Sequence, residues 1–343
     1  MLENNIFYKY IVEECEEVYN EKKFHFLKDK TVLITGATGI VGNYFLAFFL
    51  KSLEKKFAPK KIWLIYKSKL PYYLLFLRKN NKFKLIKADL SILEKFKIPK
   101  FDYIIHLAGY AQPSKFTKDP LKTFFLNTST VKFLINKLNK KGIFLNLSSS
   151  EIYNGVKGKL TEDKMGNVGI NHIRACYIEG KKTSETITNL YKKKFKINAK
   201  SIRLCSVYGP GNKKNDGRLI YQLITKGIRK NKIELLSIDK NLRTFLYMLD
   251  ALKMMINVMF FGKKDVYNIG NPKKISILNL AKKISKIINA KISLPKKNIS
   301  IGSPNNTIVL DMALYYKEFR KFNLKDLNFG IRKTVEWNKN YKY

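Results

Sequence analysis

The turn that decides the fold of this 343-residue chain reads Thr35-Gly36-Ala37-Thr38-Gly39-Ile40-Val41-Gly42. It follows the apolar run Thr31 to Ile34 and opens a segment through Leu50 that we expect to be helical. In such a unit the first glycine allows a tight turn, the second lets the backbone approach a pyrophosphate, and the third packs helix against strand. The stretch therefore predicts a dinucleotide site.

Short apolar runs recur along the chain, and most are separated by stretches long enough for a crossover helix. This alternation predicts an α/β fold with a parallel sheet covered on both faces. The expected strands are Thr31 to Thr35, Ile62 to Tyr66, Lys84 to Ala88, Tyr103 to Leu107, Ile143 to Leu147, Ser201 to Tyr208 and Asp265 to Ile269.

We expect three parts. Residues 1–29 hold six Glu and the apolar series Phe7, Ile11, Cys15 and Val18 at near-helical spacing, which predicts an acidic helical extension. It either contacts a partner or, as we favour, covers an edge of its own fold. Residues 30–208 would form a Rossmann-type, doubly wound dinucleotide-binding domain. Residues 209–343 would form mainly a smaller α/β substrate lobe, with 240–270 returning to the main sheet.

Composition limits the partners. The net charge is +41, but only 8 of the 67 basic residues are Arg and the Lys are spread along the whole chain. Because Arg is the side chain that reads base edges and stacks on bases, we expect a solvated Lys-rich surface and no nucleic-acid partner. Such a surface steers acidic substrates towards the protein.

The cysteine, histidine and hydropathy patterns argue against a metal site, a disulfide scaffold and a membrane-spanning protein. The three Cys and three His have no metal-ligand spacing and give no disulfide framework. The longest apolar runs, such as 254–261, are far short of the roughly 20 residues that span a bilayer. The N-terminus has no export-signal pattern, so we expect a cytoplasmic protein without metal or membrane contact.

Residues after the second strand bear on the cofactor. An acidic residue there, about 20 residues after the glycine-rich turn, would hold the ribose 2′-hydroxyl of NAD. This chain has Tyr66-Lys67-Ser68 instead, which permits a 2′-phosphate, so NAD and NADP both fit. Asp89, after the third strand, would accept a hydrogen bond from the adenine amino group or cap the segment that begins at Ser91.

Two segments carry candidate catalytic side chains. Tyr177 and Lys181 are four residues apart, so on a helix they share a face. We expect the ammonium to lower the phenol pKa from about 10 and make Tyr177 a usable base. The stretch Ser148-Ser149-Ser150-Glu151-Ile152-Tyr153 ends the fifth strand, where open α/β sheets bind ligands. It offers a hydroxyl for a substrate oxygen and a second acid or base, unless it is only a capped turn.

Together these residues resemble the extended short-chain dehydrogenase/reductase family over about residues 30 to 280, in the order glycine-rich turn, His106-Leu107-Ala108-Gly109, Ser-Glu strand end and Tyr-Lys pair. Within that family the chain is similar to UDP-glucuronate decarboxylases. The similar stretches are Ser148 to Tyr153, Arg174 to Lys181, Asn215-Asp216-Gly217-Arg218, and Arg243-Thr244-Phe245 with Asp250.

The resemblance implies an enzyme with NAD or NADP, of which the family favours NAD. It would work on a sugar nucleotide, expected to be a UDP-sugar, through a 4-keto intermediate. Tyr177 would deprotonate the 4-hydroxyl, Lys181 would tune Tyr177 and hold the nicotinamide ribose, Ser149 would bind the 4-oxygen and Glu151 would assist at C5. The substrate contacts would be Ser150, Arg174, Arg218 and Arg243. Besides Tyr177 and Lys181, the cofactor contacts would be Gly36, Thr38, Gly39, Ile40, Gly42, Lys67, Asp89, Leu90, Leu107, Ala108 and Gly109.

The chain also departs from the decarboxylase pattern. Sugar-nucleotide 4,6-dehydratases carry Asp where this chain has Ser150, which counts against dehydration. The stretch Pro304 to Asp311 has no arginine, although the decarboxylases carry arginines there. A 4-epimerase and an NADPH-dependent 4-keto-sugar reductase therefore stay open, as does a nucleic-acid-binding protein on a retired dehydrogenase fold. The family implies a homodimer through two helices per subunit, including the one with Tyr177.

Overall fold

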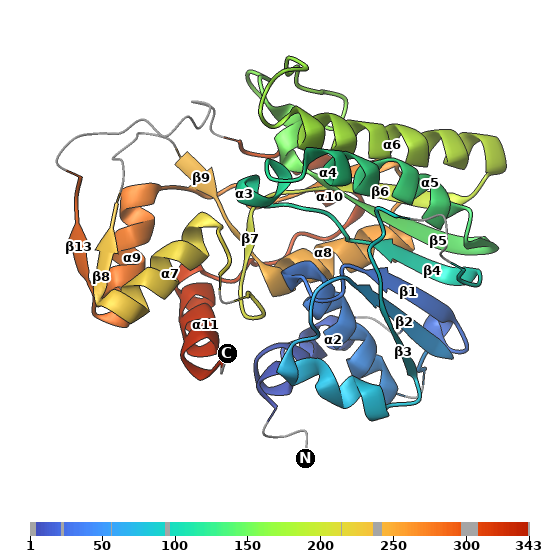
Figure 1. Cartoon of the computed structure of the whole chain (residues 1–343), viewed down its shortest axis with the longest axis horizontal. Helices are drawn as coiled ribbons and strands as arrows, with labels where there is room; N and C mark the ends of the chain where they lie inside the picture. Colours follow the sequence, from blue (N-terminus) through green and yellow to red (C-terminus); the bar gives the residue numbers. More distant parts are fainter. Residues whose placement is uncertain are drawn as a thin grey trace.

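The computed structural model describes residues 5–21, 24–55, 57–92, 97–213, 215–235, 242–295 and 308–341. Within these ranges the largest sheet has seven parallel strands in the order β11-β6-β5-β4-β1-β2-β3 (Figure 1). The chain moves outward from β1 in one direction through β2 and β3, and in the other through β4, β5 and β6. The predicted doubly wound α/β fold is therefore confirmed.

The strands occur close to where the apolar runs predict them, although β5 begins five residues earlier than expected. One expected strand, Ser201 to Tyr208, is instead two: β6 ends at Leu204, where its neighbour β11 also ends, and Val207–Tyr208 forms β7, which pairs with β10. The bounds are β1 Thr31–Thr35, β2 Lys61–Tyr66, β3 Phe83–Lys87, β4 Phe101–His106, β5 Leu138–Ser149, β6 Asn198–Leu204, β10 Leu246–Tyr247 and β11 Val266–Ile269.

Helices cover both faces of the sheet (Figure 1). On one face lie α2 (Ile40–Glu54) and α8 (Met248–Phe261), and on the other α4 (Pro120–Asn127), α5 (Ser129–Ile135) and α6 (Ala175–Phe195). The side chains of β1 alternate between the two cores: Val32 and Ile34 belong to the cluster on the α2 side, and Leu33 to the cluster on the α5 side. Burial on both faces explains why these strands are continuous apolar runs.

The N-terminal extension is helical but is not the single helix that its spacing predicts. It forms three short turns, η1 (Tyr8–Val12), α1 (Glu16–Glu21) and η2 (His25–Leu27). The segment packs along α2, where the Tyr19 hydroxyl donates to the Phe48 carbonyl at 2.7 Å. The breaks between turns let the chain follow the surface of the fold while its apolar residues stay buried: Phe7, Ile11, Cys15 and Val18.

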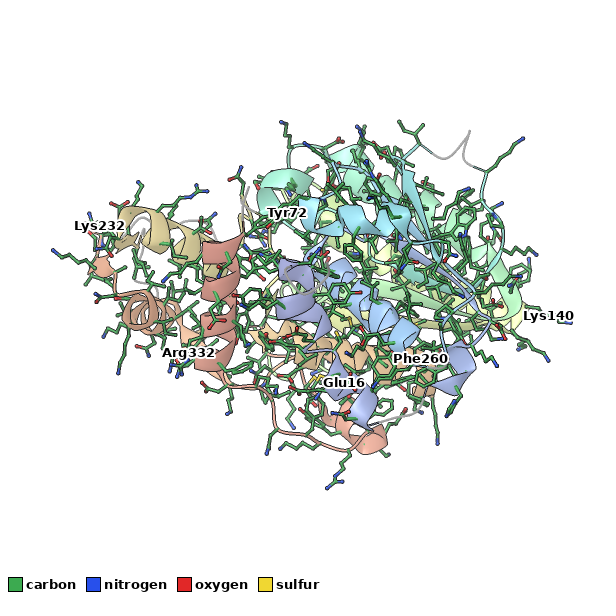
Figure 2. All side chains as sticks on the ribbon, turned by 90° about the horizontal axis from the view of Figure 1, so that it is seen from below. Glu16, Tyr72, Lys140, Lys232, Phe260 and Arg332 are labelled. Carbon is green, nitrogen blue, oxygen red and sulfur yellow. The ribbon has the colours of Figure 1, made fainter. Side chains whose placement is uncertain are left out.

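The C-terminal part forms a smaller group of elements beside the sheet (Figure 1). Its helices are α7 (Leu219–Lys230), α9 (Ile277–Ile288) and α11 (Leu327–Asn340), and its paired strands are β8 (Lys232–Glu234) with β13 (Lys291–Ser293) and β9 (Leu242–Thr244) with β12 (Lys274–Ser276). Side chains that end in nitrogen extend from the molecule on all sides in Figure 2, including those of Lys140 and Lys232 at its two ends. No helix in the described ranges is long and apolar enough to cross a membrane.

Candidate active site

A cavity of about 590 Å³ opens at the carboxyl ends of the sheet strands, at the point between β1 and β4 where the strand order reverses. Open α/β sheets bind their ligands at this position. The residues predicted to contact the cofactor from outside α6 all line it: Gly36, Thr38, Gly39, Ile40, Gly42, Lys67, Asp89, Leu90, Leu107, Ala108 and Gly109.

The glycine-rich turn has the shape that a dinucleotide pyrophosphate requires. Gly36 has φ +68°, and a Cβ there would lie 2.8 Å from the Ala108 amide nitrogen. A Cβ on Gly42 would lie 2.4 Å from the Gly36 carbonyl oxygen. Gly39 begins α2 without a side-chain cap, so the first amides of the helix are available to an anion in the cavity. The turn therefore fits the diphosphate of NAD or NADP.

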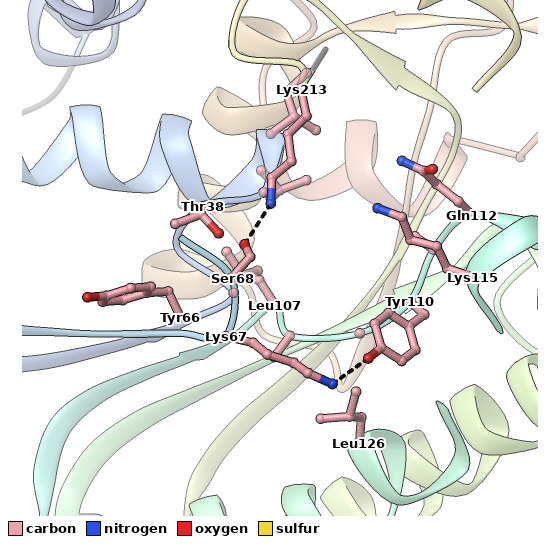
Figure 3. Close-up of a pocket in the computed structure, with 18 of the residues that line it drawn as sticks. Thr38, Tyr66, Lys67, Ser68, Leu107, Tyr110, Gln112, Lys115, Leu126 and Lys213 are labelled. Carbon is pink, nitrogen blue, oxygen red and sulfur yellow. Dashed lines mark hydrogen bonds between the residues drawn. The ribbon is translucent and has the colours of Figure 1, made fainter. Parts of the chain in front are cut away.

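Lys67 lies at the end of β2 and is already paired. Its Nζ is 2.9 Å from Asp89 Oδ2 and donates to the Tyr110 hydroxyl at 2.7 Å (Figure 3). Asp89 Oδ1 also accepts from the amide and hydroxyl of Ser91, at 3.1 and 2.7 Å. Asp89 therefore closes a local turn with Ser91, where the described residues form no helix, and it neutralises Lys67.

Residues outside the sequence motifs also face the cavity. Lys213, in the loop after β7, donates to the Ser68 hydroxyl at 3.2 Å. Lys115, in α3 (Pro113–Phe116), and Gln112, directly before α3, extend towards the cavity (Figure 3). Burial lowers the pKa of Lys213, and the charge of Lys115 adds to that shift. No sequence signal marks these lysines in a chain with 67 basic residues.

The candidate catalytic side chains meet between α6 and the end of β5. Hydrogen bonding by the nearby Ser149 side chain lowers the pKa of Tyr177. The Tyr177 ring stacks on Phe116, with centroids 5.0 Å apart and planes 10° apart. The Lys181 ammonium donates to the carbonyl of Leu147, which lines the cavity, at 2.5 Å. The pair thus lies beside the predicted nicotinamide end of the cavity.

The pKa expected for Tyr177 is wrong. Burial raises it to about 12, the charge of Glu151 raises it further, and the hydrogen bond with Ser149 only partly opposes this. The Lys181 ammonium lies 5.9 Å from the Tyr177 ring centroid and is directed at the Leu147 carbonyl. Burial lowers the pKa of Lys181 itself to about 8. Desolvation of the two side chains therefore outweighs their mutual attraction.

Glu151 and Arg174 form an ion pair with 2.9 Å between Nη1 and Oε2. Glu151 lies in η4 (Ser150–Tyr153), directly after β5, and Arg174 precedes α6. Ser150, the first residue of η4, is half-buried. The structure thus places Arg174, a predicted substrate contact, next to Glu151, the residue predicted to assist at C5.

The other two predicted arginines are placed differently. Arg218 lines the cavity but is bound to Asp216, with 2.9 Å between Nε and Oδ1. Arg243 lies on β9, donates to the carbonyl of its neighbour Leu242 at 3.2 Å and does not line the cavity. Of the arginine-poor stretch 304–311, only 308–311 lies within the described residues.

Among the residues that the structure describes, no group of three or more His, Cys, Asp or Glu could hold a metal ion.

Comparison with protein families and with known proteins identifies the family of this chain. Residues 32–270 match the NAD dependent epimerase/dehydratase family. The chain belongs to this family. It is 27% identical over 265 residues to UDP-glucuronic acid decarboxylase 4 of Arabidopsis thaliana, an alignment that covers 76% of this chain and 58% of that protein. The chain thus spans less than two thirds of that relative's length.

Solved structures of family members have the same fold. UDP-N-acetylglucosamine 4-epimerase from Methanobrevibacter ruminantium superposes with a TM-score of 0.76 at 20% identity, covering 90% of this chain and 98% of that one. UDP-glucuronic acid 4-epimerase from Bacillus cereus, solved with UDP-glucuronic acid and NAD, gives 0.71 at 22% identity, covering 90% and 99%. At these identities the likeness establishes the fold. The family assignment makes this chain an NAD-dependent epimerase/dehydratase family enzyme.

Proposed function

We propose that this family member decarboxylates UDP-glucuronate through a transient 4-ketone. The observation that carries the proposal is the position of Tyr177 and Lys181 on α6, where Lys181 donates to the carbonyl of the cavity-lining Leu147 and Tyr177 is buried near Ser149. The bound nicotinamide would accept the C4 hydride and return it at the end of the cycle. The decarboxylase relatives, at 26 to 27% identity, support the choice of substrate.

The residues of the chain supply the proton transfers. Tyr177, in its phenolate form, takes the proton of the sugar 4-hydroxyl while Ser149 holds the oxygen. The resulting C5 carboxylate is a β-keto acid, so the bond to C5 breaks, carbon dioxide leaves and the electron pair remains as an enolate. Glu151 relays a proton from water to C5, and Tyr177 returns its proton to the 4-oxygen as the hydride returns. The cycle produces no net oxidation.

A 4-epimerase is the second candidate, and the Glu151 and Arg174 ion pair favours it. Epimerisation needs only hydride removal from one face of C4 and return to the other, so it makes no demand on Glu151. The carboxylate would then act only as the partner of Arg174.

Product analysis tests these assignments. The purified chain is incubated in D₂O with UDP-glucuronate and either NAD or NADP, and the nucleotide sugar is weighed by mass spectrometry. Loss of carbon dioxide with one deuteron at C5 is expected. An unchanged mass with a new sugar isomer would identify the epimerase, and stoichiometric oxidation of NADPH by a 4-keto-sugar would identify the reductase. No turnover of UDP-glucuronate would overturn the proposal.

The proposed assembly is a homodimer through α4 and α6. Both helices expose large apolar side chains: the exposed fractions are 69% for Leu121, 44% for Phe125 and 60% for Leu190. Apolar groups on two adjacent helices are what a second copy would cover.

We propose a cytoplasmic location, consistent with the three free cysteines of the described chain, Cys15, Cys176 and Cys205.

A further inference from the structure

The first turn of the N-terminal extension, η1, lies behind one wall of the dinucleotide cavity. That wall is formed by the irregular loop after β7, residues 209–213, which we call the wall loop. Its residues Gly211, Asn212 and Lys213 line the cavity. Ile11 of η1 is fully buried, and a Cβ on Gly211 would lie 3.0 Å from its Cδ1. At Gly211, one residue thus separates the extension from the cavity.

A side-chain amide on α2 holds the wall loop at the same point. The Asn43 amide nitrogen donates to the Gly211 carbonyl and to the Tyr73 hydroxyl, both at 3.1 Å. Tyr73 lies in η3 (Tyr72–Lys79), and its ring stacks on Phe7 of the extension, with centroids 5.7 Å apart. The extension therefore contacts both Gly211 and the side chain that shares its hydrogen-bond donor.

The helix α11 holds the next residue of the wall loop. The indole nitrogen of Trp337 donates to the Asn212 carbonyl at 3.2 Å. Tyr10 of η1 packs edge-on against the Trp337 ring, with centroids 6.3 Å apart. The Tyr10 hydroxyl also accepts from the Asn340 amide at 3.1 Å. η1 thus packs against α11 at the place where α11 holds the wall loop.

The wall loop bridges the cavity, because Lys213 donates to the Ser68 hydroxyl on the other side (Figure 3). Ordering an irregular loop costs conformational entropy. A ligand that binds to a loop already ordered in the folded chain does not incur that cost. The contacts behind the wall loop should therefore increase the affinity of the cavity for its ligand.

We infer that η1 positions the wall loop for dinucleotide binding, with Ile11 as a positioning residue. Ile11 does not line the cavity, so it acts through Gly211. This role goes beyond covering an edge of the fold, which is what the sequence predicts for the extension. The inference depends on the dinucleotide of the family and not on the proposed decarboxylation.

Titrations with NADH, without sugar substrate, test the inference. Binding to the full chain is followed by nicotinamide fluorescence, well below the melting temperature of each variant. Ile11→Ala should weaken binding about 3- to 30-fold, and Ile11→Val, which removes only the δ-methyl, about 2- to 5-fold. The Val variant serves if the Ala variant does not fold. Tyr19→Phe is the matched control, because it removes a hydrogen bond between the extension and Phe48 of α2, which does not line the cavity, and should leave NADH affinity unchanged.

Hydrogen exchange of the wild-type chain gives a second readout, because coupling between two sites is reciprocal. Saturating NADH should slow amide exchange in residues 8–12 at least threefold more than in α9, which does not line the cavity. An extension that only stabilises the fold would show the same slowing in both segments.

Three results would overturn the inference: wild-type NADH affinity in both Ile11 variants, an equal loss of affinity in Tyr19→Phe, or equal slowing of exchange in residues 8–12 and α9. Absence of NADH binding by the wild-type chain would also overturn it, because the wall loop would then face no dinucleotide. A failure of the proposed reaction is seen separately, in the mass of the nucleotide sugar, and leaves these measurements unchanged.

Discussion

Both carboxylate oxygens of Glu151 accept hydrogen bonds from one nitrogen of Arg174, whose Nη1 lies 3.0 Å from Oε1 and 2.9 Å from Oε2. In the described structure the other guanidinium nitrogens of Arg174 have no protein partner. One arginine can therefore hold Glu151 and still donate to a substrate anion. This arrangement links the residue that would protonate C5 to the residue that would hold the substrate.

Glu151→Gln is expected to separate oxidation from decarboxylation. The amide cannot deliver a proton, so carbon dioxide release should fall about 100-fold or more. Formation of reduced nicotinamide, followed by absorbance after one turnover, should persist because Tyr177 is intact. Melting temperatures should stay close to wild type, since a partly exposed ion pair contributes at most about 1 kcal/mol. Decarboxylation at the wild-type rate would remove Glu151 from the mechanism and favour the epimerase.

Tyr177→Phe is expected to lower kcat by about 100- to 10,000-fold. The ring would keep its stacking on Phe116, so folding and dinucleotide binding should be preserved. Tyr191→Phe is the matched control, because Tyr191 lies on the same helix α6 and, among the residues that the structure describes, its hydroxyl is hydrogen bonded only to the side chain of Asn136, at 3.3 Å. Steady-state rates of the two variants provide the comparison. Comparable rates would show that Tyr177 is not the base.

Substitutions of two glycines of the turn are expected to have different effects, one on dinucleotide binding and one on stability. Gly39 has ordinary extended geometry, and a Cβ there would meet only the Gly36 carbonyl oxygen, at 3.3 Å. Gly39→Val should therefore fold but fill the cavity and weaken dinucleotide binding at least tenfold. Gly36→Ala places a Cβ 2.8 Å from the Ala108 amide nitrogen at φ +68°, and should cost about 1 to 3 kcal/mol of stability. Calorimetric melting and dinucleotide titration separate the effects, and the reverse pattern would contradict the roles given to these glycines.

The sequence predicted the fold because its signals are local. The glycine-rich turn and the apolar runs specify their own conformations, and the alternation of runs and crossovers leaves few sheet orders. The same holds for the predicted cofactor contacts between Gly36 and Gly109, which occur at strand ends and therefore line one cavity at that edge of the sheet.

What the sequence did not predict depends on contacts between distant segments. The pKa of Tyr177 is set by burial that includes Phe116 from another helix, and no spacing rule relates those two residues. Lys213 reaches Ser68 across 145 residues of sequence. The ion pair of Glu151 with Arg174 likewise joins two segments that were each assigned a ligand role, and only the three-dimensional structure shows that they meet.

Apolar exposure on α4 and α6 leads to a prediction about assembly. Introducing Glu at Leu121 and Leu190 together (L121E/L190E) should convert the dimer to a monomer in light scattering after size exclusion, because a charge would be buried in the interface. Ile170→Glu is the control: Ile170 is 88% exposed in the loop before α6. A monomeric wild-type chain, or a dimer that survives the double substitution, would refute the proposed interface.

The N-terminal extension is expected to make stability fall as pH rises. Glu14 accepts a hydrogen bond from the Tyr247 hydroxyl at 2.7 Å, and burial raises the pKa of Glu14 from 4.5 to about 7. Between these values the folded chain holds a proton that the unfolded chain has lost, so the Glu14 contribution to stability is complete below pH 4.5 and lost as pH passes 7.

Glu14→Gln removes this titration and should raise the free energy of unfolding at pH 8 by about 2 to 3 kcal/mol over wild type. The control, Glu16→Gln, should instead lower it by about 1 kcal/mol or less, because Glu16 is paired with Lys51 and Lys55. Urea unfolding at pH 5 and pH 8 measures both variants, and a Glu14→Gln effect that is equal at the two pH values would show that the carboxyl does not titrate in this range.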